Sequence, residues 1–357
     1  EGISNSVPHL VEAQKNFGHE VGIISSKKSD KAVSENIYWS NMQNISLILF
    51  EFYKTLRNFG KPDILHIHDI YNLKQILFSC FFIFLGVKVF ISPRGCFSEI
   101  ALSRSKTKKK LFLILFKKFS NYIYSFVALN EGEKHQISQI FRNKKIIVIS
   151  NGSDLDEKRY NSLKKEFSSK KESKIYTIGY LGRFDIYIKG LDKLLNAFSS
   201  YQKNSKEAVI ELIFIGEHRS KEFDSFKFFK KIKNSLSKPE MFKVRNPCYG
   251  KEKWKSLASF DLLALPSRSE GMPNVVLEAM SIGVPCMVSP ETNMGEIIQN
   301  SNSGWVIEHK EEDLELFFHD LVKHDKEMLI KKGINAKNYI KHNLTWDKIA
   351  KIDYFKL

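Results

Sequence analysis

Short apolar runs alternate with amphipathic stretches along the first half of the chain. Brief apolar runs between turn residues are typical of buried strands, whereas apolar residues that recur every three or four positions are typical of helices. The predicted strands are 20–25, 63–68, 88–92, 126–129 and 145–150. The predicted helices include 9–17, 46–59 and the strongly apolar block 76–87. This alternation predicts a parallel sheet covered by helices.

A charged segment at 157–174 interrupts the pattern, because it offers no apolar stripe. The alternation then begins again, and Leu191, Leu194, Leu195 and Phe198 have the spacing of one helical face. The predicted strands of this half are 175–181, 209–215, 262–265 and 285–289. Its further helices are 273–281, 314–321 and 326–342. The end of the charged segment is therefore the predicted domain boundary.

We expect an α/β protein with two doubly wound, Rossmann-like domains that face a cleft, residues 1–168 and 169–343. The length of 357 residues suits two domains of ordinary size. In such sheets the ligand binds beyond the carboxyl ends of the strands, where helix N-termini point.

Charge and cysteine content narrow the picture. The net charge of +16 favours anionic partners, whether phosphates, nucleic acid or acidic lipid headgroups. The four cysteines form no CxxC pair, so we expect reduced thiols in a cytoplasmic protein. The sequence holds no run of 18 apolar residues and no signal-peptide pattern, so no membrane-spanning helix is expected.

The first candidate site is the glycine-bounded loop 182–190 (GRFDIYIKG), between a predicted strand and a helix. Gly182 and Gly190 bound it, and Arg183 and Lys189 lie six positions apart within it. Two cations on one loop, with a helix N-terminus behind them, suit a diphosphate. The alternative is two solvated surface cations at a turn.

The second candidate site begins at Glu270, in the loop after strand 262–265. Gly271 allows close approach of a ligand to the backbone, and Pro273 suits the first turn of a helix. Glu278 lies further along that helix, and a carboxylate accepts paired hydrogen bonds from the vicinal hydroxyls of a ribose or hexose. The alternatives are a helix-start acid at Glu270 and a surface residue at Glu278.

The pair Glu270–x7–Glu278, with loop 182–190 upstream, resembles family 4 of the retaining GT-B glycosyltransferases (glycosyl transferases group 1). The resemblance runs almost end to end and includes the segments 8–21 (PHLVEAQKNFGHEV), 63–69 (DILHIHD), 91–95 (ISPRG), 128–137 (ALNEGEKHQI), 148–154 (VISNGSD), 283–298 (GVPCMVSPETNMGEII) and 303–307 (SGWVI). It implies a GT-B fold whose C-terminal helix, about 344–357, crosses back to the N-terminal domain.

The same resemblance implies a role for each site residue. Arg183 and Lys189 would bind the diphosphate and stabilise it as leaving group, and Glu270 would lie at the transferred sugar. Glu278 would hold the ribose hydroxyls. The other donor-binding residues that it implies are Gly2, Gly182, Gly271, Met272, Pro273 and Asn274.

The chain departs from the family pattern in its N-terminal half. The family's first strand has no counterpart, and its glycine-rich loop is represented only by Glu1 and Gly2. Arg94 stands where many members carry a histidine. His68 and Arg94 are the candidates for the acceptor side.

We therefore expect a hexosyltransferase that uses a nucleotide diphospho-sugar, with retention, and a saccharide or polyprenyl-linked saccharide acceptor of bacterial surface polysaccharide (capsule or lipopolysaccharide) synthesis. No cofactor, metal or nucleic acid is expected. The alternatives are a GT-B-like sugar-nucleotide epimerase or phosphorylase, and a basic nucleic-acid-binding protein. The latter would need a recognisable binding module with interleaved basic and aromatic residues.

Three weaker patterns leave alternatives open. His66 and His68 alternate on one strand face and could ligate a metal, but no third ligand has a suitable spacing. Asp154 and Asp156 form a DxD that is interpreted as turn chemistry. In segment 104–118, lysines bracket apolar residues, which is typical either of a helix at an anionic membrane surface or of a core-packed helix. The first alternative would place the protein on the inner face of the cell membrane.

Overall fold

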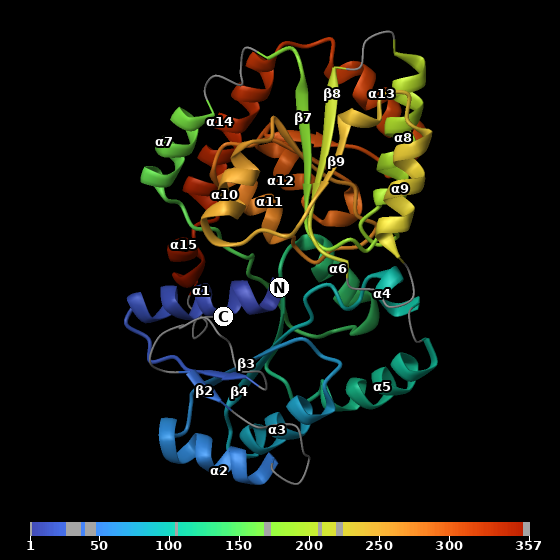
Figure 1. The fold of residues 1–357 in the computed structure, drawn as a ribbon. Helices are drawn as coiled ribbons and strands as arrows, with labels where there is room; N and C mark the ends of the chain where they lie inside the picture. Colours follow the sequence, from blue (N-terminus) through green and yellow to red (C-terminus); the bar gives the residue numbers. More distant parts are fainter. Residues whose placement is uncertain are drawn as a thin grey trace. The chain divides into compact units, whose positions relative to one another are not determined.

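The computed structural model describes residues 2–25, 37–39, 48–103, 106–167, 173–205, 209–218 and 224–352. The chain forms two compact units (Figure 1). Unit 1 comprises Glu1–Gly152 and Trp346–Leu357, and unit 2 comprises Ser153–Thr345. Both units are α/β bodies in which every described strand pairing is parallel, as the alternating pattern predicts.

Unit 1 contains a sheet with the strand order β3-β4-β5-β6 and a separate parallel pair, β1-β2. Its strands are β1 (Ile23–Ser25), β2 (Ile37–Trp39), β3 (Ile64–His68), β4 (Lys88–Ser92), β5 (Ser125–Ala128) and β6 (Ile146–Val148). Its helices are α1 (Gly2–Asn16), α2 (Ile48–Phe59), α3 (Leu73–Phe84), α4 (Glu99–Ser103), α5 (Lys106–Phe119), α6 (Glu131–Ile140) and α15 (Trp346–Ala350).

Aromatic side chains fill the core of unit 1. Phe126 of β5 is fully buried, and its ring centroid lies 4.8 Å from that of Phe141, after α6. Phe116 of α5 packs edge-on against Phe141 at 5.7 Å. Such pairs add to the burial of large apolar area, so they hold α5 and α6 against the sheet.

Helix α1 differs from the prediction at its N-terminal end. The pattern predicts a helix over 9–17, but α1 extends back through Pro8 to Gly2. Ser6, Leu10 and Ala13 are buried at helical spacing, so one face of the whole helix packs inward. Gly2 is therefore the first residue of this helix.

The C-terminal segment returns to unit 1, as the resemblance implies. Helix α15 packs on α1, and the ring of Trp346 stacks on that of His9 at 6.0 Å between centroids. A Cβ at Gly152 would lie 2.7 Å from the Trp346 ring, so only glycine fits there. The helix ends earlier than expected, at Ala350, and residues 353–357 lie outside the described chain.

Unit 2 is built on a sheet with the strand order β12-β11-β10-β7-β8-β9. Its strands are β7 (Tyr176–Leu181), β8 (Ile210–Ile215), β9 (Phe242–Arg245), β10 (Leu262–Leu265), β11 (Cys286–Val288) and β12 (Gly304–Val306). Its helices are α7 (Glu157–Glu166), α8 (Leu191–Asn204), α9 (Ser225–Ser235), α10 (Gly250–Ala258), α11 (Asn274–Ser281), α12 (Gly295–Asn300), α13 (Glu311–Leu321) and α14 (Lys326–Asn343).

This strand order is that of a doubly wound Rossmann sheet. The chain starts at β7, proceeds outward through β8 to β9, and returns to pair β10 with the other edge of β7. Helices α8, α9 and α13 pack together on one side of the sheet, and α11 packs against α14 on the other (Figure 1). The strand order therefore reverses between β7 and β10, where such sheets bind ligands.

The division between the units differs from the predicted one. The predicted boundary at 168/169 falls on residues outside the described chain, whereas the first crossing lies at Gly152/Ser153. Part of the charged segment 157–174 forms α7, which packs on α10 of unit 2. Leu163 is buried there, and the Arg159 guanidinium lies 4.3 Å from the centre of the Trp254 ring. Helix α7 has no apolar stripe, so one buried leucine and one cation–π contact attach it to unit 2 instead.

Among the described helices, none has the length and hydropathy of a membrane-spanning segment.

Candidate active site

Two loops of unit 2 begin side by side, because they follow neighbouring strands. Loop 182–190 connects β7 to α8, and loop 266–273 connects β10 to α11. In the register of these parallel strands, Ile178 lies opposite Leu262 and Gly179 opposite Leu263. Both loops therefore emerge at the point where the strand order reverses.

Close backbone contacts fix the two loops against each other. The Arg268 N–H donates to the carbonyl oxygen of Ile188 at 2.7 Å. Gly190 has a left-handed φ of +65°, and a Cβ there would lie 2.0 Å from the carbonyl oxygen of Pro266. Only glycine satisfies both conditions, so Gly190 sets how closely the loops approach.

Lys189 and Glu270 form an ion pair between these loops. Both side chains are largely buried, at 15% and 14% exposure. Ser267 donates from Oγ to Glu270 Oε1 at 2.9 Å, which orients the carboxylate. The fold thus brings together two predicted site residues that are far apart in the sequence. Arg183, at the start of the first loop, has an exposed side chain.

The segment after β11 braces the Glu270 loop. The backbone N–H of Glu270 donates to the carbonyl of Glu291 at 3.0 Å. The Asn293 side-chain amide donates to the carbonyl of Glu270 at 2.7 Å. Ser289 donates from Oγ to the carbonyl of Ser267 at 2.5 Å. The predicted motif 283–298 therefore acts as a support for the loop that carries Glu270.

Glu278 is buried in α11, with 8% exposure, which excludes the surface position that the sequence left open. Lys253 of α10 reaches both of its carboxylate oxygens at 2.6 Å. Lys253 was missed by sequence reasoning, because nothing in its local pattern distinguishes it from other surface lysines.

The remaining predicted donor residues of unit 2 lie on the same two loops or, in the case of Asn274, at the start of α11. Met272 and Pro273 are buried, and Pro273 is the N-cap of α11. Gly271 and Asn274 flank them and are partly exposed. The Gly182 N–H donates to the carbonyl of Ile215 at 3.0 Å, so this glycine joins the ends of β7 and β8.

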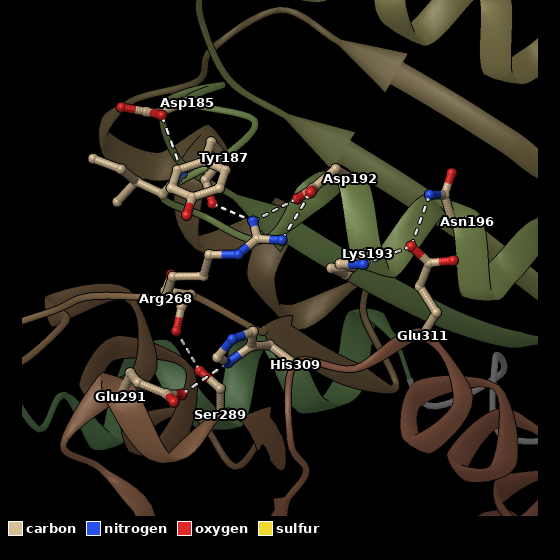
Figure 2. A network of polar contacts seen from close by, with 12 residues as sticks. Asp185, Tyr187, Asp192, Lys193, Asn196, Arg268, Ser289, Glu291, His309 and Glu311 are labelled. Carbon is tan, nitrogen blue, oxygen red and sulfur yellow. Dashed lines mark hydrogen bonds and ion pairs between the residues drawn. The ribbon is translucent and has the colours of Figure 1, made fainter. Parts of the chain in front are cut away.

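Arg268 is a second residue that sequence reasoning missed. Its guanidinium makes a two-pronged contact with the Asp192 carboxylate, at 2.7 and 2.8 Å (Figure 2). The same group lies 4.4 Å from the centre of the Tyr187 ring. Asp192 follows the first loop and Arg268 lies in the second, so this pair joins the bases of both loops.

A polar cluster in unit 1 gathers at the carboxyl ends of its strands. Arg94, in the turn after β4, donates from Nε to His68 Nδ1 at 3.2 Å. Its Nη1 donates to Asn151 Oδ1 at 2.9 Å and to Ser6 Oγ at 3.1 Å. Arg94 has a φ of +54°, an unusual backbone conformation for a residue with a side chain. The structure thus brings together His68 and Arg94, the two predicted acceptor-side residues.

Glu133 of α6 lies fully buried beside this cluster. Its carboxylate accepts the backbone N–H groups of Gly95 at 2.5 Å and Leu129 at 2.7 Å. Burial raises the pKa of Glu133, while these two bonds and the Arg94 charge oppose that shift. The carboxylate therefore fixes the turn that presents Arg94.

The comparisons with known proteins decide the family. A family model described as Glycosyltransferase Family 4 matches residues 1–157. A second model, described as Glycosyl transferases group 1, matches residues 161–338. The chain is a glycosyltransferase of the group 1/family 4 type.

Two relatives and one solved structure show the range of similarity. The glycosyltransferase is 24% identical to an uncharacterized 41.2 kDa protein in the cps region of Klebsiella pneumoniae, over 86% of this chain and 82% of that protein. It is 36% identical over 85 residues, 24% of this chain and 21% of the relative, to a UDP-Gal:alpha-D-GlcNAc-diphosphoundecaprenol alpha-1,3-galactosyltransferase of Escherichia coli. Anabaena HepE, solved with UDP and glucose, superposes with a TM-score of 0.71 at 13% identity, covering 98% of this chain and 94% of HepE. The fold is GT-B, as the resemblance implies.

The weaker metal interpretations gain no support in the glycosyltransferase. Among its described residues, no group of three or more His, Cys, Asp or Glu side chains is arranged to hold a metal ion. His66 Nε2 lies 2.7 Å from Ser92 Oγ, and the His66 and His68 rings lie 4.2 Å apart. Asp156 caps α7 by accepting the Arg159 N–H, which agrees with its interpretation as turn chemistry.

The two histidines are held neutral. Burial and the Arg94 charge lower the pKa of His66 to about 3. Burial, His66 and Arg94 lower the pKa of His68 well below its usual range. Because His68 Nδ1 accepts the Arg94 Nε–H, the proton of the neutral ring lies on Nε2. His68 therefore offers a hydrogen-bond donor from Nε2.

We expect stability to fall as the pH is lowered from about 7 to about 5. The unfolded chain protonates these histidines below about pH 6.5, whereas the folded chain keeps them neutral. Each contributes a loss of up to about 1.4 kcal/mol per pH unit between its unfolded and folded pKa values. Thermal unfolding should show this slope, and His66→Gln should reduce it. Imidazole NMR that showed His66 protonated in the folded chain at about pH 5 would contradict the assignment.

Proposed function

We propose that the enzyme transfers a hexosyl unit, with retention, from a nucleotide diphospho-sugar to a hydroxyl of a saccharide or polyprenyl-linked saccharide. The observation that carries this proposal is the Lys189–Glu270 pair at the reversal of strand order in unit 2. One loop supplies cations for a diphosphate, and the other supplies a carboxylate for sugar hydroxyls. The two groups are adjacent, as the phosphate and the sugar are in such a donor.

The diphosphate is the leaving group of this reaction, and negative charge grows on it in the transition state. Arg183 and Lys189 share loop 182–190, and the α11 N-terminus follows the other loop. Donors and cations fixed before the reaction stabilise developing charge most effectively. In this proposal they take the part that Mg²⁺ or Mn²⁺ plays elsewhere, so neither a metal nor a cofactor is needed.

Glu278 binds the ribose in this proposal. Its carboxylate is buried and held by Lys253, so it has a fixed direction. Each carboxylate oxygen has two acceptor sites, so contact with Lys253 leaves capacity for hydroxyl donors.

The acceptor assignment is supported by the relatives. The Escherichia coli relative is named for an acceptor linked to diphosphoundecaprenol. The Klebsiella pneumoniae relative is named for a cps region. We therefore propose a role in bacterial surface polysaccharide synthesis, at the inner face of the cell membrane. His68 and Arg94 of unit 1 are the proposed acceptor-side groups.

The two glutamates should divide the work between binding and transfer. Glu278→Gln should weaken binding of the sugar-free nucleotide diphosphate by about tenfold, because hydrogen bonds to a charged acceptor are lost. Glu270→Gln should leave that affinity nearly intact and lower transfer by about 10²-fold. Calorimetry measures the first effect and a product assay the second.

Glu252→Gln is the matched control, since Glu252 is exposed on α10 next to Lys253 and loses the same charge. It should change neither quantity. Equal losses of nucleotide affinity in Glu270→Gln and Glu278→Gln would refute the separate roles proposed for the two glutamates. Release of free sugar phosphate or an epimerised nucleotide as the main product would favour the phosphorylase or epimerase alternative.

Helix α5 supplies the proposed membrane surface. Leu111, Ile114 and Leu115 are 64%, 53% and 61% exposed, and they share one helical face. Phe119, the last residue of α5, packs against the core of unit 1. The first residues of segment 104–118, Arg104 and Ser105, lie outside the described chain.

Four exposed lysines accompany the apolar face, namely Lys108, Lys110, Lys117 and Lys118. Lys109 was expected with them, but its Nζ lies 4.8 Å from the centre of the Tyr71 ring and bonds the carbonyl of Ala101. Exposed apolar residues beside lysines complement an anionic bilayer, since the lysines remain at headgroup level. We propose that this face holds the enzyme near a lipid-linked acceptor.

Replacing these four lysines with Gln should abolish binding to anionic vesicles while sparing hydrolysis of the donor. Each lysine contributes about 1 kcal/mol near an anionic surface, and salt screens the attraction. The matched control replaces Lys227, Lys230, Lys231 and Lys233, which are exposed on α9 of unit 2 and remove the same charge. Vesicle sedimentation in which both variants bind alike would exclude α5 as the docking surface.

A further inference from the structure

Arg268 is a buried cation, with 8% exposure, that contacts loop 182–190 and the first turn of α8. Its guanidinium binds both oxygens of Asp192, stacks on the Tyr187 ring and donates from Nη1 to the Tyr187 carbonyl (Figure 2). Taking a charge out of water is costly unless its partners are well placed. The site therefore holds an ionic contact whose cation is buried and whose carboxylate is partly exposed.

This ion pair lies close in sequence to Lys189 and Glu270, so it can influence their positions. Asp192 lies in the first turn of α8, three residues after Lys189. Arg268 lies two residues before Glu270. Two ion pairs therefore link the same two segments of the described chain. The Arg268–Asp192 pair is one, and the Lys189–Glu270 pair is the other.

We propose that Arg268 is a positioning residue, whose pair with Asp192 fixes the separation of Lys189 and Glu270. Because it assigns the diphosphate to Lys189 and the sugar to Glu270, this inference rests on the proposed function. In those terms, Arg268 sets the distance between the bound diphosphate and the hydroxyls of the transferred sugar. It touches neither of them and acts through the two loops.

An arginine suits this role better than a lysine. Its planar fork binds both carboxylate oxygens and its flat face stacks on an aromatic ring, whereas a lysine is a flexible point charge. The Tyr187 stack and the contact with the Tyr187 carbonyl fix the guanidinium in the first loop as well. Reaction rates are sensitive to such placement, since a shift of about 1 Å costs about 10²-fold.

The neighbouring residue provides a matched control. Lys193 also lies in the first turn of α8 and forms an ion pair, at 2.8 Å from Glu311 (Figure 2). Asn196 donates to the same carboxylate at 3.0 Å. This pair joins α8 to the start of α13 and does not involve loop 266–273. Lys193→Met therefore removes an ion pair from the same helical turn but leaves the Arg268–Asp192 pair in place.

The experiment compares Arg268→Lys, Asp192→Asn and Lys193→Met in the full chain. For Arg268→Lys and Asp192→Asn we expect kcat for transfer to fall about 10²-fold. The affinity for UDP, the probe nucleotide, should change much less. Flexible cationic side chains can still reach a bound diphosphate when the loops shift, whereas the transition state requires exact placement of the same groups. Lys193→Met should keep the wild-type kcat. Equal losses of kcat in Lys193→Met and Arg268→Lys would overturn the proposal. Wild-type kcat in both Arg268→Lys and Asp192→Asn would also overturn it.

A second measurement separates positioning from simple stability. Residues that act as a unit have non-additive effects, so Arg268→Lys should cost little further kcat in a Glu270→Gln background. A purely structural role would lower kcat by the same factor in both backgrounds and would overturn the proposal. Should Arg268→Lys fail to fold, Asp192→Asn enters the same cycle. Wild-type turnover in Glu270→Gln alone would instead refute the proposed function, so the two failures are distinguishable.

Discussion

The pairing of β7 with β10 is the constraint on which the proposed donor site depends. These strands are adjacent although more than one βα unit separates them in the chain, because the sheet reverses its order between them. Their following loops must therefore emerge together. Gly190 then permits the close approach that a side chain would block against Pro266. The Lys189–Glu270 and Arg268–Asp192 ion pairs both follow from this one neighbour relation.

Three ion pairs between described residues lie in this candidate site. Lys189 faces Glu270, Arg268 faces Asp192, and Lys253 faces Glu278. Such pairs keep buried charges tolerable, because each partner replaces part of the lost hydration. In the proposed reaction, a diphosphate bound beside Lys189 would share that cation with Glu270. In the proposed function, donor recognition would use charge pairs that the fold itself holds in place.

Local patterns were sufficient for most strands and for the two candidate loops. Strand β10 was predicted at 262–265 as a run of buried apolar residues, and the glycines around Arg183 and Lys189 indicated a loop. Helix α7 was missed because a single buried leucine carries its packing. The Arg268–Asp192 and Lys253–Glu278 pairs join residues from separate elements, so no local spacing could indicate them. The extension of α1 to Gly2 depends on burial of Ser6, a residue that no hydrophobic pattern marks.

Calorimetry of the full chain with UDP in excess EDTA tests the central claim most directly. If Lys189 and its loop form a diphosphate site without a metal, UDP binds under these conditions and Lys189→Met weakens it by about tenfold or more, since a charge-assisted contact is lost. Uridine, which lacks the diphosphate, should bind both proteins alike. Equal UDP affinity in wild type and Lys189→Met, or UDP binding only after a divalent metal is restored, would contradict the account.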